Sequence, residues 1–140
     1  MAVNSTRNFY TLGLDVGDVR IGTAIAGSIA RIPQPNETID RTDDPIASLR
    51  RIINTEDIEK IIIGIPRNLK GEETPQSAKI RQFATEIEKT LGLPIVFVDE
   101  SLSSKRADKF LSDQKRQGAT QDSIAACFIL DEYFATLEDV

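Results

Sequence analysis

The 140-residue sequence contains no histidine, no tryptophan and a single cysteine, Cys127. The absence of histidine excludes Ser-His and Cys-His catalytic pairs, histidine-ligated zinc sites and an imidazole general base. The lone cysteine cannot form an internal disulfide, and its position in an apolar run predicts a buried thiol in a reducing compartment. If the protein is an enzyme, its carboxylates must therefore carry the chemistry, and hard metal ions are compatible with such a site.

Long apolar runs are also missing. No stretch approaches the roughly 18 apolar residues of a membrane-spanning helix, and the first nine residues lack the apolar segment of a signal peptide. We therefore expect a cytoplasmic protein with no membrane partner. A length of 140 residues fits one domain over residues 1–140. With 40% hydrophobic and 28% charged residues, the composition is that of an ordinary globular protein.

Positive charge is scarce overall but concentrated locally. The chain has 17 Lys and Arg against 22 Asp and Glu, a net charge of -5, which taken alone disfavours a nucleic-acid partner. However, residues 101–120 contain five basic and two acidic side chains, whereas residues 121–140 contain five acidic and no basic ones. A basic rim beside an acidic centre is therefore compatible with the sequence.

The apolar pattern predicts strands that alternate with helices after an initial group of strands. Alternation from Tyr10 to Val16 and a second apolar segment predict a hairpin that turns at Gly17-Asp18. The β-branched run Ile61-Ile62-Ile63 predicts a central parallel strand that is covered on both faces. The expected strands are 10–16, 21–26, 29–39 (an edge segment interrupted by two prolines), 58–65 and 94–98, and the expected helices are 45–54, 75–91, 103–112 and 120–136. Such an order indicates an α/β protein with a mixed sheet.

Three carboxylates lie where this order of elements would bring distant parts of the chain together. Asp15 is on the face of the first strand opposite its leucines, and Glu100 directly follows a strand, at the end where open α/β sheets place ligands. Asp122 is in the first turn of the last helix. Two such charges about 4 Å apart repel by about 4 kcal/mol at an effective dielectric near 20, so the cluster needs a raised pKa or bound cations. Oxygen ligands alone select Mg²⁺ or Mn²⁺ over zinc.

Each acid also has an ordinary structural interpretation. Asp15 could bond the turn at Gly17, and Asp122 could be only a helix cap. Glu100 could be a solvated strand end, and on composition its neighbour Asp99 is an equal candidate. Only the joint placement of the three favours a site.

Two glycine-containing segments flank these acids. In the segment 13–22, Gly17 can adopt positive φ and Gly22 removes side-chain bulk, so a phosphate or metal could approach the backbone beside Asp15. A strand rather than a helix is expected after this segment, which disfavours a Rossmann dinucleotide site. The second segment, 64–71, places cationic and amide donors at the end of the central strand, although it could be an ordinary solvated loop.

Four motifs in matching order resemble those of the YqgF family of Holliday-junction-resolvase-like proteins, which are also described as pre-16S ribosomal RNA nucleases. The motifs are GLDVGDVRIG at 13–22, GIPRNLKG at 64–71, VDESLSS at 98–104 and DSIAA at 122–126. The resemblance implies a ribonuclease H-like fold, with a mixed five-stranded sheet flanked by helices. It also implies a two-metal nuclease in which Asp15, Glu100 and Asp122 are the catalytic and metal-binding residues, with Mg²⁺ or Mn²⁺ as cofactor.

The same resemblance implies a nucleic-acid substrate, RNA rather than DNA, and a role at the 5′ end of precursor 16S ribosomal RNA, with the ribosome precursor as a partner. The residues expected to bind substrate are Arg20, Arg67, Asn68, Lys70, Lys105 and Arg106. One position departs from the family, which usually has arginine where this chain has Ser101. That change removes a guanidinium expected to face phosphate, for which Arg67, Lys105 or Arg106 could compensate.

Alternatives stay open at this point. Ser101 and the acidic balance favour a non-catalytic nucleic-acid or ribosome-associated binding protein, and a Holliday-junction resolvase would use the same acids. The Gly-x-Asp-x-Gly start also opens the phosphate loop of actin-like and sugar-kinase proteins, but that fold needs a second similar domain for which 140 residues are too few. The sequence is compatible with either a monomer or a homodimer.

Overall fold

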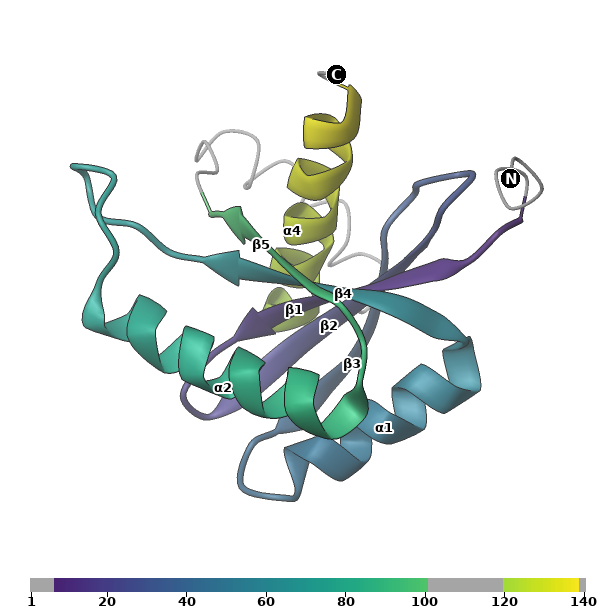
Figure 1. The fold of residues 1–140 in the computed structure, drawn as a ribbon, viewed down its shortest axis with the longest axis horizontal. Coiled ribbons are helices and arrows are strands. Elements are labelled where there is room, and N and C mark those ends of the chain that lie inside the picture. The colour runs from purple at the N-terminus through teal and green to yellow at the C-terminus, as the bar shows by residue number, and fades with distance from the viewer. Residues whose placement is uncertain (1–6, 101–119, 139–140) are drawn as a thin grey trace.

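The computed structural model describes residues 7–100 and 120–138 (Figure 1). Its elements are β1 (Tyr10–Val16), β2 (Arg20–Gly27), β3 (Gln34–Asp40), α1 (Pro45–Glu56), β4 (Ile58–Ile65), α2 (Pro75–Leu91), β5 (Ile95–Asp99) and α4 (Gln121–Glu138). The predicted helix 103–112, Ser101, Lys105 and Arg106 lie outside the described residues. Among the helices that are described, none has the length and apolar character needed to cross a membrane.

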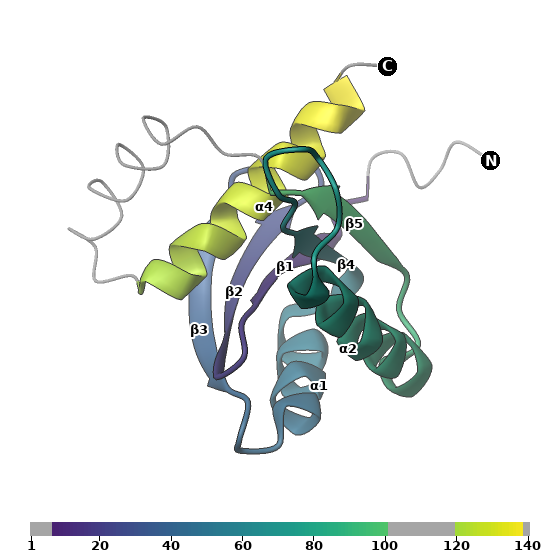
Figure 2. The same cartoon turned by 90° about the vertical axis from the view of Figure 1, so that its left-hand side faces the viewer.

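The strands form one five-stranded mixed sheet in the order β3-β2-β1-β4-β5. Strands β1, β2 and β3 pair antiparallel, whereas β4 is parallel to β1 and β5 is parallel to β4. Helices α1 and α2 cover one face of the sheet and α4 crosses the other (Figure 2). The mixed α/β architecture expected from the sequence is therefore confirmed.

One predicted strand is shorter than expected. The segment expected over 29–39 pairs only from Gln34, because residues 28–30 form a turn and Arg31 adopts a positive φ of 56°. Its position at the edge of the sheet agrees with the prolines, since proline cannot donate to a sheet ladder.

The central strand β4 is buried on both faces, as its β-branched run predicts. Ile61 and Ile63 pack with Leu12 and Leu14 in the core under α1 and α2, while Ile62 packs with the apolar face of α4. Leu12 and Leu14 of β1 are also fully buried on the α1 and α2 side. The other face of β1, which carries Asp15, is therefore turned toward α4.

Candidate active site

Asp15 and Glu100 meet at the carboxyl ends of β1 and β5, two parallel strands that lie on either side of β4. Asp15 is near the end of β1, and Glu100 follows β5 and extends its ladder, because its N–H donates to the Ile65 carbonyl at 3.0 Å. Their side chains are hydrogen-bonded to each other. The turn at Gly17 is closed without Asp15, since the Gly17 N–H donates to the Arg20 carbonyl at 2.9 Å. Asp15 is thus available to a site.

Burial dominates the electrostatics of this acid pair. The pKa of Glu100 is raised to about 7, mainly by burial and in addition by the charge of Asp15 and the hydrogen bond between the two side chains. Burial also raises the pKa of Asp15, against the lowering effect of its hydrogen bond to Glu100, and the charge of Asp122 adds to the rise. The pattern is that of a protonated Glu100 donating to an Asp15 carboxylate near neutral pH.

The pair should make folding stability depend on pH. Glu100 keeps its proton in the folded protein up to about pH 7, whereas the unfolded chain releases it near 4.5, so stability falls as the pH rises between these values. With EDTA present, the free energy of unfolding of Glu100→Gln relative to that of wild type should therefore rise by on the order of 2 kcal/mol from pH 5 to pH 8. Urea unfolding at both pH values measures this gain. The control Glu86→Gln, at an exposed position on α2, should instead differ from wild type by the same free energy of unfolding at both pH values. A Glu100→Gln difference that did not change with pH would contradict the raised pKa.

Asp122 reaches the same region from α4. The helix is capped by Thr120, whose hydroxyl accepts a hydrogen bond from the Ser123 N–H at 3.1 Å, so Asp122 is not the cap. Its main chain lies directly on Gly22, where a Cβ would overlap the Asp122 carbonyl group. Because Gly22 pairs with Asp15 across the β1–β2 ladder, this contact places Asp122 beside Asp15. A second glycine, Gly64, admits Glu100, since a Cβ there would lie 2.8 Å from the Glu100 Cγ.

The carboxylate of Asp122 nevertheless has another partner. The Arg20 Nε donates to its Oδ2 at 2.8 Å, and the two side chains are 62% and 32% exposed. Over residues 7–100 and 120–138, no three Asp, Glu, Cys or His side chains lie close enough together to hold a metal ion. The structure thus brings Asp15 and Glu100 into contact, with Asp122 near enough to influence Asp15 while paired to Arg20.

The chemistry of the donors fits a hard divalent cation. All three side chains offer only carboxylate oxygens, which Mg²⁺ and Mn²⁺ prefer. Two of them converge, and the charge of Asp15 disfavours the charged form of Glu100, a penalty that a cation would relieve. The glycines below Glu100 and Asp122 supply the close approach that such a cluster needs. The metal-binding role of the three acids stays a prediction.

The loop after β4 lies beside Glu100 and is braced internally. The Arg67 Nε donates to Asp99 Oδ1 at 2.7 Å, which separates the two adjacent acids, because Asp99 pairs with the loop and Glu100 with Asp15. Asn68 Oδ1 accepts the N–H groups of Lys70 and Glu72, both at 2.9 Å. Arg67 and Asn68 therefore shape the loop, and Lys70 is exposed on it. Contact of these three residues with substrate stays a prediction.

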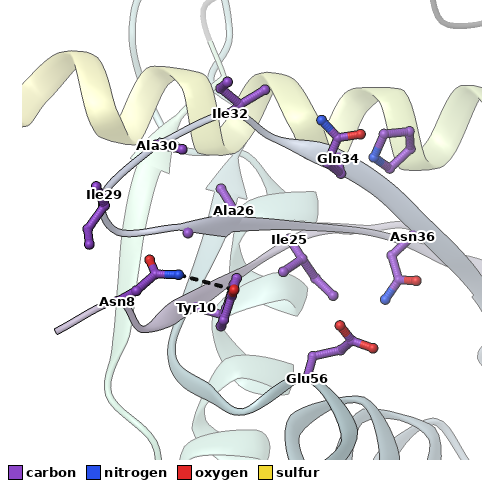
Figure 3. A pocket seen from close by; sticks show the side chains of 12 residues that line it. Asn8, Tyr10, Ile25, Ala26, Ile29, Ala30, Ile32, Gln34, Asn36 and Glu56 are labelled. Atoms are coloured by element: carbon purple, nitrogen blue, oxygen red, sulfur yellow. Dashed lines mark hydrogen bonds between the residues drawn. The ribbon is translucent and has the colours of Figure 1, made fainter.

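An apolar pocket lies at the opposite end of the sheet and contains none of the predicted site residues (Figure 3). It has a volume of about 570 Å³ and is lined by Tyr10, Ile25, Ile29 and Pro35, among others. Its one acidic lining residue is Glu56, so no carboxylate pair is present there. The acid cluster at the other end remains the candidate for chemistry.

Comparisons with known proteins found a matching family and similar relatives. Residues 10–136 match the family described as "RuvX: Holliday junction resolvase". Two relatives carry the name "Putative pre-16S rRNA nuclease": one from Caldanaerobacter subterraneus is 33% identical over 129 residues, covering 87% of this chain and 93% of its own, and one from Ruegeria sp. is 38% identical over 125 residues, covering 85% and 80%.

Solved structures support the fold. Thermus thermophilus RuvC superimposes with a TM-score of 0.61 at 12% identity, covering 94% of this chain and 97% of that one. The fowlpox virus Holliday junction resolvase gives a TM-score of 0.55 at 16% identity, covering 94% and 100%. The ribonuclease H-like fold predicted from the sequence is confirmed.

Proposed function

Because this chain belongs to the RuvX Holliday junction resolvase family, we propose that it cleaves precursor 16S ribosomal RNA with divalent ions held by Asp15, Glu100 and Asp122. The chain is a nuclease that hydrolyses phosphodiester bonds, as its family and its relatives establish. The RNA substrate is proposed from the relatives' names, and processing of that RNA implies a cytoplasmic location. The divalent ions are proposed from the chain's own residues.

The observation that carries the metal proposal is the buried contact between Asp15 and Glu100. Burial and the nearby charge of Asp15 raise the pKa of Glu100 to about 7. Ionising Glu100 therefore costs free energy, which is unfavourable for a pair with a purely structural role. Bound Mg²⁺ or Mn²⁺ would supply an activated water and stabilise the leaving oxygen of the phosphodiester. The chain itself would contribute three oxygen donors, from β1, from the end of β5 and from the first turn of α4.

We assign substrate binding to the basic groups around the acids. Lys70 is exposed on the braced loop beside Glu100, and Arg20 lies on the other side of the site beside Asp122. Arg67, Asn68, Lys105 and Arg106 complete the proposed set, the last two from outside the described residues. Arg67 supports the rim through its pair with Asp99, which fixes the loop next to the strand end.

A panel of substrates tests the proposal. The full chain should cleave RNA that carries the 5′ precursor segment of 16S ribosomal RNA in Mg²⁺ or Mn²⁺, and should leave it intact in EDTA. Unrelated single-stranded RNA and a four-way DNA junction should be cleaved at least about tenfold more slowly, a difference of about 1.4 kcal/mol in activation free energy. Gel analysis of end-labelled substrates gives the rates.

The other results of the panel have defined meanings. Preferential cleavage of the junction would reassign the chain to the resolvase activity that its family description names. Cleavage of precursor RNA that persists in EDTA would reject the proposed ions. Binding without cleavage of any substrate would support the alternative of a non-catalytic nucleic-acid or ribosome-associated protein.

A further inference from the structure

Arg20 is placed between two carboxylates, one inside the candidate site and one outside it. It is the first residue of β2 and lies two positions from Gly22, on the same face of the strand, so its side chain reaches the first turn of α4. There its Nε donates to Asp122 Oδ2 at 2.8 Å. In the β2–β3 ladder it is paired with Asp40, whose pKa is lowered mainly by hydrogen bonds from Thr42 and in part by the charge of Arg20.

We propose that Arg20 is a positioning residue that competes with a divalent cation for the Asp122 carboxylate, and so sets how tightly the nuclease site binds metal. The inference rests on the proposed function, in which Asp122 is a metal ligand. In the metal-free protein the Arg20 guanidinium is the cation at Asp122, so metal binding requires that the metal ion replace the guanidinium there.

The competition follows from the geometry of the pair. A guanidinium nitrogen at 2.8 Å occupies one side of Oδ2 and neutralises the charge that would attract a cation. A divalent ion on the same carboxylate would lie within a few ångströms of the guanidinium, and like charges at that separation repel by kilocalories per mole even at a high effective dielectric.

The surroundings of Arg20 keep the free-energy cost of leaving Asp122 small. Its side chain is 62% exposed, so leaving Asp122 uncovers little apolar surface. Asp40 keeps a second negative charge within reach of the guanidinium, so the arginine is not left without electrostatic compensation. A substrate phosphate would attract the same guanidinium, so binding of nucleic acid and binding of metal would favour each other.

Mn²⁺ titration of the purified full-length protein by calorimetry tests the inference. Arg20→Gln removes the charge and should bind Mn²⁺ about tenfold more tightly than wild type, whereas Arg20→Lys keeps the charge and should stay within about threefold. Arg50→Gln is the matched control, because Arg50 is exposed on α1, on the opposite face of the sheet, and should change the affinity less than twofold. Mn²⁺ should also raise the Tm of Arg20→Gln more than that of wild type.

Asp122→Asn separates failure of this inference from failure of the proposed function. If Asp122→Asn weakens Mn²⁺ binding but Arg20→Gln does not strengthen it, Arg20 does not compete and only the inference is overturned. If Asp122→Asn binds Mn²⁺ like wild type, Asp122 is not a ligand, and the metal site of the proposed function fails with it. If Arg20→Gln is poorly folded, Arg20→Met keeps the length without the charge and decides the same question.

Discussion

Replacing Asp15 by asparagine should reduce divalent-dependent cleavage by about 1000-fold or more, a loss of about 4 kcal/mol of transition-state stabilisation. Asp15 touches Glu100 directly and its pKa responds to the charge of Asp122, so it is the acid that connects the other two. The substitution keeps the size of the side chain but removes the negative charge that attracts a metal ion. The change therefore removes function at the centre of the site.

The same substitution should leave the fold intact. Asp15 is on a central strand whose other face is filled by Leu12 and Leu14, and none of those contacts involves its carboxylate. Burial raises the pKa of Asp15, which means that the charged form is disfavoured where it stands. Asp15→Asn should therefore unfold at the same Tm as wild type or a few degrees higher in EDTA, as measured by circular dichroism.

Asp18→Asn is the matched control for this prediction. Asp18 lies three residues away in the exposed turn between β1 and β2, and the substitution makes the same chemical change outside the acid cluster. Its cleavage rate should stay within about twofold of wild type. A folded Asp15→Asn protein that cleaves as fast as Asp18→Asn would reject the site.

The placement of Asp15 and the burial of β4 could be predicted from the sequence, because both depend on local periodicity. Alternation along β1 assigns Leu12 and Asp15 to opposite faces, and the run of three isoleucines needs cover on both sides of β4. The starts of two helices could also be predicted from local signals, since α1 and α2 begin at Pro45 and Pro75, as expected.

Individual side-chain pairings between distant segments could not be predicted in this way. One such pairing is that of Asp99 with Arg67, which is about thirty residues earlier in the sequence. Nothing in the local pattern indicates that Arg20 would pair with Asp122, because the two are 102 residues apart in sequence. The start of β3 was also misplaced, since its turn depends on a positive φ at Arg31, a residue type that gives no signal for it.

The largest structural effect is expected for Gly22→Ala, which should destabilise the protein by on the order of 3 kcal/mol. A Cβ at Gly22 would overlap the carbonyl group of Asp122, and main-chain atoms of a helix cannot move aside as a flexible side chain can. The start of α4 is also tied to β3 through the hydroxyls of Thr38 and Thr120, 2.7 Å apart. Urea unfolding should show the loss of stability.

Gly27→Ala, in the same strand, controls for the intrinsic effect of replacing glycine. A Cβ there would meet only side-chain atoms of Asn8 and Tyr10 at 3.0 Å or more, so the cost should stay below about 1 kcal/mol. Equal stabilities of Gly22→Ala and Gly27→Ala would show that α4 does not lie on Gly22 as described.

Gly22→Ala also separates the position of Asp122 from its charge. At a temperature where the variant stays folded, the displaced first turn of α4 should weaken Mn²⁺ binding and slow cleavage at least about tenfold, although every carboxylate is still present. Glu100 should keep its raised pKa, because its main causes are burial and Asp15 rather than Asp122. The pH dependence of stability would therefore persist while metal binding falls. Wild-type affinity for Mn²⁺ in the folded variant would instead mean that metal binding does not depend on where α4 places Asp122.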